Sequence, residues 1–315
     1  MRIAVMGAGA VGGYYGAKLA RVGHEVWFIA RRERLAAYRT SGVRVESIDG
    51  DFQVVPARAH REPGSVGKVE LVIFAVKSRH TRRAAEEARP LVGPHTTVLA
   101  IQNGGDNEEV LEEVLGADRV VPGVAAIGVS MPEPGLVRHT NNGSITLGEV
   151  SGEETPRVIG IREALEGAGV ETRLSSDIRS VKWRKLVWNA AFNPVAALTG
   201  GRVLDLIELD DTRELAEAAM REAIAVGEAL GHDVADYDMA RATQRDPNWA
   251  RSKTSMLQDV ERGRPTEIEA LTGAVVRLGE EVGVPTPVCR TLTRLVRARE
   301  RDLVEGREDH QTSRR

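Results

Sequence analysis

Cysteine is almost absent from the sequence, because Cys289 is the single example among 315 residues. One thiol can form neither an internal disulfide nor a metal site built from several cysteines, and such sparse use fits a reducing compartment. We therefore expect no metal site. Aromatic residues are scarce as well, at 4% of the chain, but this bias points to no particular function.

Long apolar runs are also missing. No stretch approaches the ~20 consecutive apolar residues that a membrane-spanning helix requires. The apolar residues within 1–6 run straight into glycine and form too short a segment for the hydrophobic region of a signal peptide. We therefore expect a cytoplasmic protein with no membrane partner.

Neither sign of charge predominates. The 43 basic and 46 acidic residues leave a formal net charge of −3, and the isoelectric point is near 6.2. No whole-chain basic field is available to hold nucleic acid, so we expect no nucleic-acid partner, and any bound anion must be held by local groups. Hydrophobic residues at 42% and charged residues at 28% are the proportions of an ordinary folded protein, and the length allows two domains.

The first half of the chain alternates predicted strands with predicted helices. Residues 3–6 and 26–29 have strand patterns on either side of a glycine turn and an Ala-rich helix that ends near Gly23. The runs at 71–76 and 97–101 are continuous and rich in β-branched residues, which is typical of parallel strands covered on both faces. We also expect helices over about 80–88 and 107–115, a hairpin over 43–55, and strands near 119–130, 136–140 and 144–149.

Strand patterns end after Asp177, and long segments with the 3.6-residue period of helices replace them. These segments lie at about 178–198, 211–231, 252–262, 266–283 and 286–304, and the polar residues 305–315 are expected to fray. The second half is therefore predicted to be all-helical. Long helices with apolar residues at exposed positions are compatible with a homodimer.

Residues Gly7-Ala8-Gly9-Ala10-Val11-Gly12 fit the pattern G-x-G-x-x-G between a predicted strand and a predicted helix. The first glycine permits a tight turn, the second lets the backbone approach a pyrophosphate, and the third allows close packing of helix and strand, while the helix N-terminus favours an anion. A glycine turn that serves packing alone is the alternative, but the βαβ context favours a dinucleotide site. We therefore predict an α/β fold, with a Rossmann-type dinucleotide-binding domain over residues 1–175 followed by an all-α domain over residues 176–315.

Arg31 follows the second predicted strand at the place where an NAD-specific site usually carries an acidic residue. A guanidinium offers a bidentate partner for a 2′-phosphate, so NADP is favoured over NAD. A solvated charged loop is the alternative explanation of the arginines at 31–34. Two more strand ends, at Val76-Lys77 and at residues 102–105, converge on the same edge of the sheet and are expected cofactor contacts.

Lys185, Asn189 and Asn193 are spaced four residues apart, so they share one stripe of a helix. Asparagine in a helix interior lowers helix propensity, a cost that a specific amide contact can recover. A solvated helix face is the alternative, but aromatic residues occupy the intervening positions. The stripe therefore indicates a polar site on an otherwise apolar helix.

A second group of polar residues lies at 254–260 and 265–269. Thr266 after Pro265 resembles a helix start, which would put Glu267 in the first helical turn. An acid there complements the helix dipole, and this structural explanation is sufficient when the residue is considered alone.

Several motifs occur in a fixed order along nearly the whole chain. They are Gly7-Ala8-Gly9-Ala10-Val11-Gly12, Gly23-His24-Glu25-Val26 with Arg31, Val76-Lys77, Gln102-Asn103-Gly104, Lys185-Leu186 with Asn189 and Asn193-Pro194, and Ser255-Met256-Leu257-Gln258-Asp259 with Glu267-Ile268. Together they closely resemble the motifs of the ketopantoate reductase (2-dehydropantoate 2-reductase) family. The segment at 255–259 with its downstream Thr266-Glu267-Ile268 is much more specific than the glycine motif.

The resemblance implies a two-domain NADPH-dependent oxidoreductase that reduces ketopantoate to (R)-pantoate in pantothenate and coenzyme A biosynthesis. It implies that Lys185 is the general acid and that Glu267 positions the substrate or the lysine. It further implies substrate contacts at Asn103, Asn189, Asn193 and Ser255, and cofactor contacts at Gly7, Ala8, Gly9, Ala10, Val11, Gly12, Arg31, Lys77, Asn103, Ala125 and Glu267. The chain departs from some members at residues 199–204, which lack a further substrate-facing asparagine.

The residue types agree with this chemistry independently. Hydride transfer to a ketone develops negative charge on oxygen, so the site needs a proton donor there and a positioned carbonyl group. An ammonium group beside a basic cofactor site has its pKa lowered towards the range useful for proton transfer. The alternatives are an NADP-dependent reductase of another small 2-oxo acid and a dinucleotide-binding sensor without turnover, although a sensor needs neither the Lys/Asn stripe nor Ser255 and Glu267.

Overall fold

The computed structural model describes residues 1–244 and 253–312 of the chain. The chain divides into two compact units, Met1–Val181 and Lys182–Arg315. The division falls inside one helix, α6 (Ile178–Thr199), whereas residue 175, the predicted boundary, lies between β10 (Thr172–Leu174) and this helix. Each unit has a hydrophobic core of its own.

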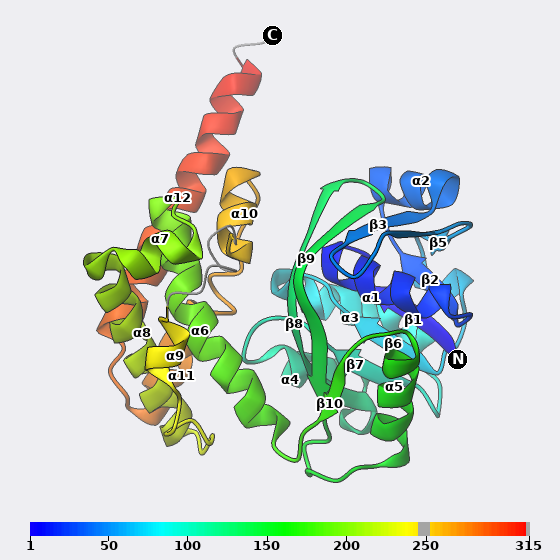
Figure 1. Ribbon diagram of the computed structural model, residues 1–315, viewed down its shortest axis with the longest axis horizontal. Coiled ribbons are helices and arrows are strands. Elements are labelled where there is room, and N and C mark those ends of the chain that lie inside the picture. Colours follow the sequence, from blue (N-terminus) through cyan, green and yellow to red (C-terminus); the bar gives the residue numbers. More distant parts are fainter. Residues whose placement is uncertain (245–252, 313–315) are drawn as a thin grey trace. The chain divides into compact units, whose positions relative to one another are not determined.

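A parallel sheet forms the centre of the first unit (Figure 1). Its strands are β1 (Arg2–Met6), β2 (Glu25–Ile29), β5 (Arg58–His60), β6 (Leu71–Phe74), β7 (Thr97–Ala100) and β8 (Val120–Glu133). They lie in the order β5-β2-β1-β6-β7-β8, and every neighbouring pair in this run is parallel. This is the strand order of a Rossmann-type sheet. The strands predicted at 71–76 and 97–101 are confirmed, and β6 and β7 are buried along their whole length.

Helices connect these strands and cover the sheet. They are α1 (Ala10–Arg21), α2 (Arg32–Ser41), α3 (Thr81–Ala88), α4 (Asn107–Leu115) and α5 (Pro156–Gly167), with short 3-10 turns at Pro63–Ser65, Ser78–His80, Arg89–Leu91 and Ala117–Arg119. The predicted helices near 80–88 and 107–115 are therefore confirmed. Alternate residues of β1 enter two different apolar clusters, Ile3 and Val5 in one and Ala4 and Met6 in the other. Both faces of the sheet are thus buried, as the continuous apolar strands require.

The sheet continues beyond β8 through strands of mixed direction. β9 (Leu136–Leu147) pairs antiparallel with β8, and β3 (Val43–Ser47) pairs parallel with β9. β4 (Phe52–Val54) pairs antiparallel with β3, which confirms the predicted hairpin over 43–55. The strands predicted separately near 136–140 and 144–149 are one strand, β9, and β10 pairs parallel with its end.

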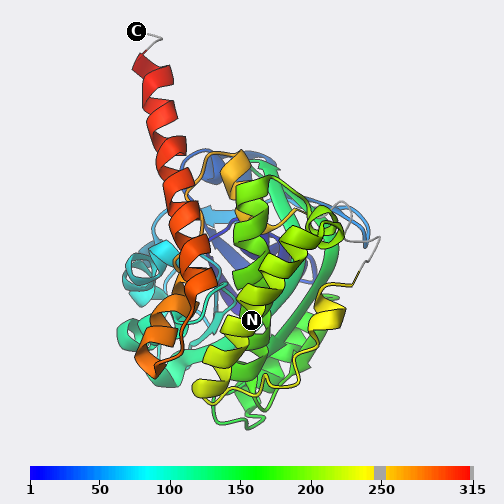
Figure 2. The ribbon, with the colours of Figure 1, turned by 90° about the vertical axis from the view of Figure 1, so that its left-hand side faces the viewer.

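The second unit contains helices and no strand within its described residues, 182–244 and 253–312, which confirms the all-α prediction. Its helices are α6, α7 (Val203–Glu208), α8 (Asp210–Ala229), α9 (Met239–Ala242), α10 (Ser255–Glu261), α11 (Thr272–Val282) and α12 (Pro287–Thr312). Figure 2 faces this unit and shows α12, coloured orange to red, extending beyond the other helices. Side chains of α6, α8 and α12 such as Phe192, Met220 and Leu292 meet in its core. No helix within residues 1–244 and 253–312 is both long and apolar enough to cross a membrane.

The helix predicted over 266–283 is wrong at its start, because α11 begins only at Thr272. The backbone N–H of Thr266 donates to Glu300 Oε1 at 2.5 Å, and the N–H of Ile268 donates to the Thr266 hydroxyl at 3.2 Å. Side chains therefore satisfy two backbone N–H groups of the turn that precedes α11. Glu267 consequently lies in the turn before α11 and not in its first helical turn.

The helix predicted over 286–304 continues to Thr312 as α12, so residues 305–312, which are expected to fray, are helical. Residues 313–315 and residue 252, the predicted start of another helix, lie outside the described residues. That helix, α10, begins at Ser255.

Candidate active site

The glycine turn lies between β1 and α1, and two of its glycines are required by the fold. Gly7 has a φ of +92°, in the left-handed region that favours glycine, and a Cβ there would lie 2.7 Å from the backbone of Ala75. A Cβ at Gly12 would lie 2.4 Å from the Gly7 carbonyl oxygen and 2.8 Å from Val5 Cγ1. These contacts explain glycine at both positions through the turn and the packing of α1 on β1.

Gly9 is different, because the fold leaves room for a side chain there. A Cβ at Gly9 would meet nothing closer than the Gly7 carbonyl oxygen at 3.9 Å, and its φ of −82° is open to any residue. Gly9 is also the N-cap of α1 and supplies no capping side chain to the first-turn N–H groups of Ala10, Val11 and Gly12. Such groups have no acceptor within a helix, and with the helix dipole they favour an anion. The turn can therefore hold a phosphate against its backbone.

Arg31 lies at the N-cap of α2, just beyond the end of β2, and its side chain is exposed. Its guanidinium forms an ion pair with Glu87 of α3, and Arg83 binds the same carboxylate at 3.0 Å. Partial burial, followed by the charges of Arg79, Arg31 and Arg83, lowers the pKa of His80. Four basic side chains and one carboxylate thus gather beside the carboxyl ends of β2 and β6.

Asn103 is held by a hydrogen-bond network at the ends of β6 and β7. Its carbonyl oxygen accepts hydrogen bonds from the Ser78 hydroxyl at 2.8 Å and from Asn107 Nδ2 at 2.7 Å. The amide of the preceding residue, Gln102, donates to the Thr81 hydroxyl at 2.8 Å, which in turn lies 2.8 Å from Asn107 Oδ1. Because Gln102, Thr81 and Asn107 are buried, this network fixes the backbone that carries Asn103.

Lys77 lies just past the end of β6, and Ala125 lies within β8, beyond the part that pairs with β7. Lys77 follows β6 and begins a 3-10 turn, in which its carbonyl oxygen accepts from the N–H of His80 at 2.8 Å. Ala125 lies on β8, beyond Pro122, which pairs with Ala100 at the end of β7. The predicted cofactor residues of the first unit therefore all lie at or beyond the carboxyl ends of parallel strands, the edge at which open α/β sheets bind ligands.

In the second unit, α6 carries Lys185, Asn189 and Asn193 on one stripe, as their spacing predicts. Asn193 Nδ2 donates to Asn189 Oδ1 at 3.2 Å, and both amides are buried, with 1% and 8% of their surfaces exposed. Asn193 Oδ1 has no hydrogen-bond partner within the described part of the chain. A buried acceptor without a donor costs roughly 1–3 kcal/mol, so this oxygen is suited to a ligand that donates a hydrogen bond.

Pro194 interrupts the hydrogen bonding of α6 beside this stripe. Proline has no N–H, so the carbonyl oxygen of Ala190, four residues earlier, loses its helical donor. The fully buried Thr272 hydroxyl supplies a replacement and donates to that oxygen at 3.0 Å. Since Thr272 is the first residue of α11, this bond ties the turn that contains Glu267 to α6.

Lys185 is half-buried on α6. Burial, and then the charge of Lys182, lower the pKa of Lys185 to about 8, while the charge of Glu267 acts to raise it. Glu267 itself is 8% exposed. The structure therefore brings the two predicted catalytic residues into electrostatic contact, although sequence spacing places them 82 positions apart, and it gives the lysine a pKa suited to proton transfer near neutral pH.

Ser255 differs from Glu267 and the two asparagines of α6 in its exposure. It is the first residue of α10 and is exposed, whereas the preceding Thr254 is buried and caps the helix by accepting the N–H of Leu257 at 3.2 Å. The fold thus explains Thr254 through capping. It gives no structural reason for a serine at 255, which leaves its hydroxyl available to a ligand.

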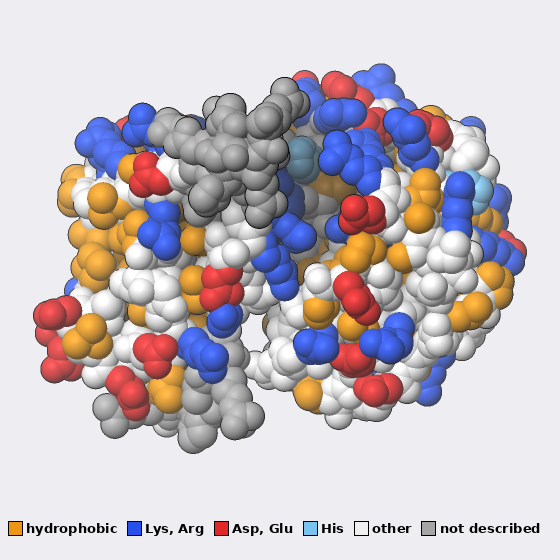
Figure 3. Space-filling model, turned by 90° about the horizontal axis from the view of Figure 1, so that it is seen from above, with side chains coloured by type: hydrophobic (Ala, Val, Ile, Leu, Met, Phe, Trp, Pro, Cys, Tyr) orange, Lys and Arg blue, Asp and Glu red, His pale blue; other side chains and the backbone are white. Residues whose placement is uncertain are grey.

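The surface charge is mixed, in agreement with the small net charge. Figure 3 shows Lys and Arg side chains gathered on part of the first unit, with Asp and Glu side chains among them. The described residues include no group of three or more His, Cys, Asp or Glu that could hold a metal ion. The glycine turn and the arginines near Arg31 are therefore the local groups at which an anion would be held.

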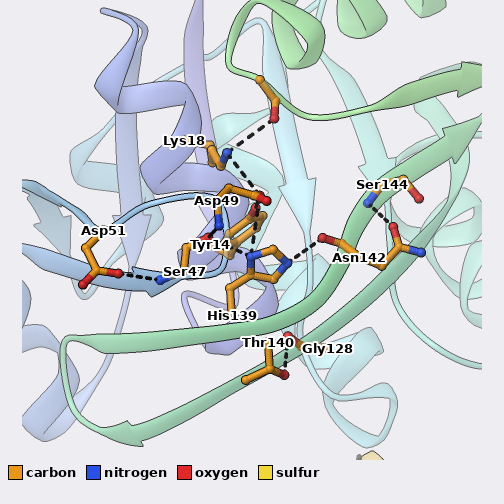
Figure 4. Close-up of polar contacts among 11 residues, drawn as sticks. Tyr14, Lys18, Ser47, Asp49, Asp51, Gly128, His139, Thr140, Asn142 and Ser144 are labelled. Carbon is orange, nitrogen blue, oxygen red and sulfur yellow. Dashed lines mark hydrogen bonds and ion pairs between the residues drawn. The ribbon is translucent and has the colours of Figure 1, made fainter. Parts of the chain in front are cut away.

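A polar cluster that the sequence did not reveal joins α1 to the strands beyond β8 (Figure 4). The Ser47 hydroxyl lies 2.9 Å from His139 Nδ1, Tyr14 donates to Asp49 Oδ2 at 3.4 Å, and Lys18 Nζ lies 3.9 Å from the same carboxylate. Asp49 Oδ2 lies 3.8 Å from His139 Nδ1, the same ring nitrogen that the Ser47 hydroxyl contacts. In a catalytic triad the acid and the nucleophile instead bind opposite ring nitrogens of the histidine. The His139 side chain is also fully buried, so the cluster holds the fold together and is not a second active site.

The strand order and the glycine turn after the first strand define the first unit as a Rossmann-type dinucleotide-binding unit. The helical unit carries a lysine with a lowered pKa and two buried asparagine amides on one stripe of α6. The chain belongs to the ketopantoate reductase PanE/ApbA family, whose model matches residues 3–152, while the model of the family's C-terminal part matches residues 177–300. The family resemblance found in the sequence and the predicted fold are both confirmed, and the family places the chain among oxidoreductases.

Individual relatives cover nearly the whole chain. The 2-dehydropantoate 2-reductase of Mesorhizobium japonicum is 36% identical, with 94% of this chain and 97% of the relative covered. The crystal structure of 2-dehydropantoate 2-reductase from Geobacter metallireducens has a TM-score of 0.90 and 36% identity, covering 95% of this chain and 99% of that one. A structure of D-mandelate dehydrogenase shares the fold, with a TM-score of 0.89 at 24% identity over 96% of this chain and 99% of that one.

Proposed function

We propose that this protein catalyses the NADPH-dependent reduction of ketopantoate to (R)-pantoate, a step of pantothenate and coenzyme A biosynthesis. Relatives named 2-dehydropantoate 2-reductase support ketopantoate reduction in general. The observation that carries the proposed mechanism is the half-buried Lys185, whose pKa of about 8 lies well below the ordinary value of 10.5. This residue is suited to be the general acid.

The proposed cofactor contacts lie at the carboxyl edge of the sheet in the first unit, and Glu267 is a further proposed contact. The open backbone at Gly9 and the first-turn amides of α1 fit a pyrophosphate, and the guanidinium of Arg31 fits a 2′-phosphate. Lys77, Asn103 and Ala125 are the remaining proposed contacts. NADPH supplies the hydride for the reaction.

The protein's own residues then serve the substrate. Negative charge develops on the ketone oxygen during reduction, and Lys185 Nζ donates the proton that this oxygen takes up. Asn189, Asn193 and Ser255 are proposed to bind the carboxylate and hydroxyl groups of ketopantoate, and Asn103 to bridge substrate and cofactor. Glu267, close enough to influence the Lys185 charge, orients the lysine. The reaction requires the cofactor and Lys185 to reach the same carbonyl group.

Steady-state rates of NADPH and NADH oxidation with a panel of 2-oxo acids test this proposal. We expect ketopantoate to have the highest kcat/KM, and Lys185→Ala to lose about 10²–10⁴-fold in kcat while its NADPH affinity stays close to that of the parent. A near-normal kcat in Lys185→Ala would move the acid role elsewhere, with Glu267 the next candidate.

Reduction of another small 2-oxo acid is the second candidate function. It is favoured by residues 199–204, which lack the asparagine that some members of the family direct at the substrate. The same panel separates the two functions, because the second predicts a higher kcat/KM for an acid other than ketopantoate. Cofactor binding without turnover on any acid would instead indicate a dinucleotide sensor.

A further inference from the structure

Glu87 of α3 is placed where it affects the proposed cofactor site. The Glu87 carboxylate is bound by the guanidinium of Arg31, 56 positions earlier in the sequence, and by Arg83 one helical turn away at 3.0 Å. Partial burial acts to raise the pKa of Glu87, but hydrogen bonds from Arg83 and Arg31 hold it below its ordinary value. The carboxyl group is therefore ionised at neutral pH.

A carboxylate and a phosphate monoester use the same groups of arginine, because both bind its planar N–H donors as charged acceptors. Glu87 occupies Nη2 of Arg31, so a 2′-phosphate that binds the guanidinium through this nitrogen shares it with the carboxylate or displaces the carboxylate. The negative charge of Glu87 also opposes the approach of a dianion, whereas the neutral 2′-hydroxyl of NADH meets no such opposition. Glu87 therefore acts differently on the two cofactors.

We propose that Glu87 is a specificity-determining residue that acts through Arg31, by competing with the 2′-phosphate of NADPH for its guanidinium. This inference rests on the proposed use of NADPH through Arg31. The chain has Arg31 where an NAD-specific site carries an acidic residue, and Glu87 places a carboxylate beside that arginine. Glu87 keeps the preference for NADPH smaller than Arg31 alone would give.

Binding of adenosine 2′,5′-bisphosphate and of 5′-AMP tests the inference without turnover, because the two probes differ only in the 2′-phosphate. We expect Glu87→Gln to tighten the bisphosphate about threefold or more and to leave 5′-AMP unchanged, since exposed charge pairs are worth a few-fold in affinity and the phosphate carries up to two charges. In the full enzyme the KM for NADPH should fall by a similar factor at unchanged kcat. The KM for NADH should not change.

Glu86→Gln is the matched control, because Glu86 is the exposed neighbour on the same helix and its loss changes the net charge equally. Glu86→Gln should increase the affinity for the bisphosphate by less than half as much as Glu87→Gln does. Glu87→Asp keeps the carboxylate and should retain the parent affinities. An equal effect of the two glutamine variants would reduce Glu87 to one surface charge among others and overturn the inference.

Arg31→Ala separates this inference from the proposed cofactor. If Arg31→Ala leaves the affinity for the bisphosphate unchanged, the proposed role of Arg31 in NADPH binding fails, and the inference fails with it. If Arg31→Ala weakens binding but Glu87→Gln fails to strengthen it, the inference alone is overturned, and weaker binding in Glu87→Gln would mean that Glu87 orients Arg31. In the Arg31→Ala background, the gain from Glu87→Gln should be largely lost.

Discussion

Lys185 sets the pH dependence of the proposed reduction. Burial and the charge of Lys182 lower the pKa of Lys185 to about 8 against the opposing effect of Glu267. A general acid must be protonated, so kcat/KM for reduction is highest below this pKa and falls as the pH rises through it. About nine tenths of Lys185 is protonated at pH 7 and about one tenth at pH 9, so the rate should fall about tenfold between them.

Two neighbouring charges supply opposite perturbations of this profile. Lys182→Gln removes a like charge, which raises the pKa of Lys185 and moves the falling limb to higher pH. Glu267→Gln removes an opposite charge and moves the limb to lower pH. A general loss of stability cannot shift the two profiles in opposite directions.

Initial rates of NADPH oxidation across this pH range provide the assay. Oxidation of pantoate by NADP in the reverse direction is the internal control, because it needs the neutral lysine as a base and should speed up over the same interval. A rate that stays level between pH 7 and pH 9, as a lysine with the ordinary pKa of 10.5 would give, or the same falling limb in Lys185→Ala, would refute the assignment of Lys185.

Three further predictions concern separate parts of the chain. Gly12→Ala should lose about 1–3 kcal/mol of unfolding free energy, because its methyl group would overlap the Gly7 carbonyl oxygen. Gly9→Ala should melt normally but bind NADPH more weakly in a fluorescence titration. Equal destabilisation of the two variants would contradict this contrast. Thr272→Val should lose about 1–3 kcal/mol in urea unfolding and Thr272→Ser much less, and an unchanged midpoint in the valine variant would rule out the bond to α6 as a source of stability. Asn193→Ala and Ser255→Ala should each raise KM for ketopantoate roughly tenfold at nearly constant NADPH affinity; a loss of cofactor binding as large as that of Gly9→Ala would show that the proposed roles are misassigned.

The features that the sequence predicts well depend on local pattern. The turn at residues 7–12 is specified by glycines between a strand and a helix, and the α6 stripe follows from a spacing of four residues in an unbroken helix. The buried strands β6 and β7 are equally evident, because they are apolar at every position. Such features need no knowledge of distant residues.

The features that the sequence misses depend on contacts between distant residues. Glu300 accepts a hydrogen bond from the backbone of Thr266, 34 positions away, in the turn that contains Glu267. The partnership of Arg31 with Glu87 spans 56 positions, and that of Ser47 with His139 spans 92. No periodicity or local motif encodes these pairings, because they form only when separate elements pack together.

Transfer of deuterium from NADPH that carries deuterium at both C4 positions of the nicotinamide tests the central claim most directly. With ketopantoate as substrate, we predict pantoate with deuterium on the carbon that bears the new hydroxyl group, and loss of this product in Lys185→Ala. Mass spectrometry and NMR of the product decide the outcome. Unlabelled pantoate, or no pantoate while another 2-oxo acid is reduced efficiently, would contradict the proposed reaction.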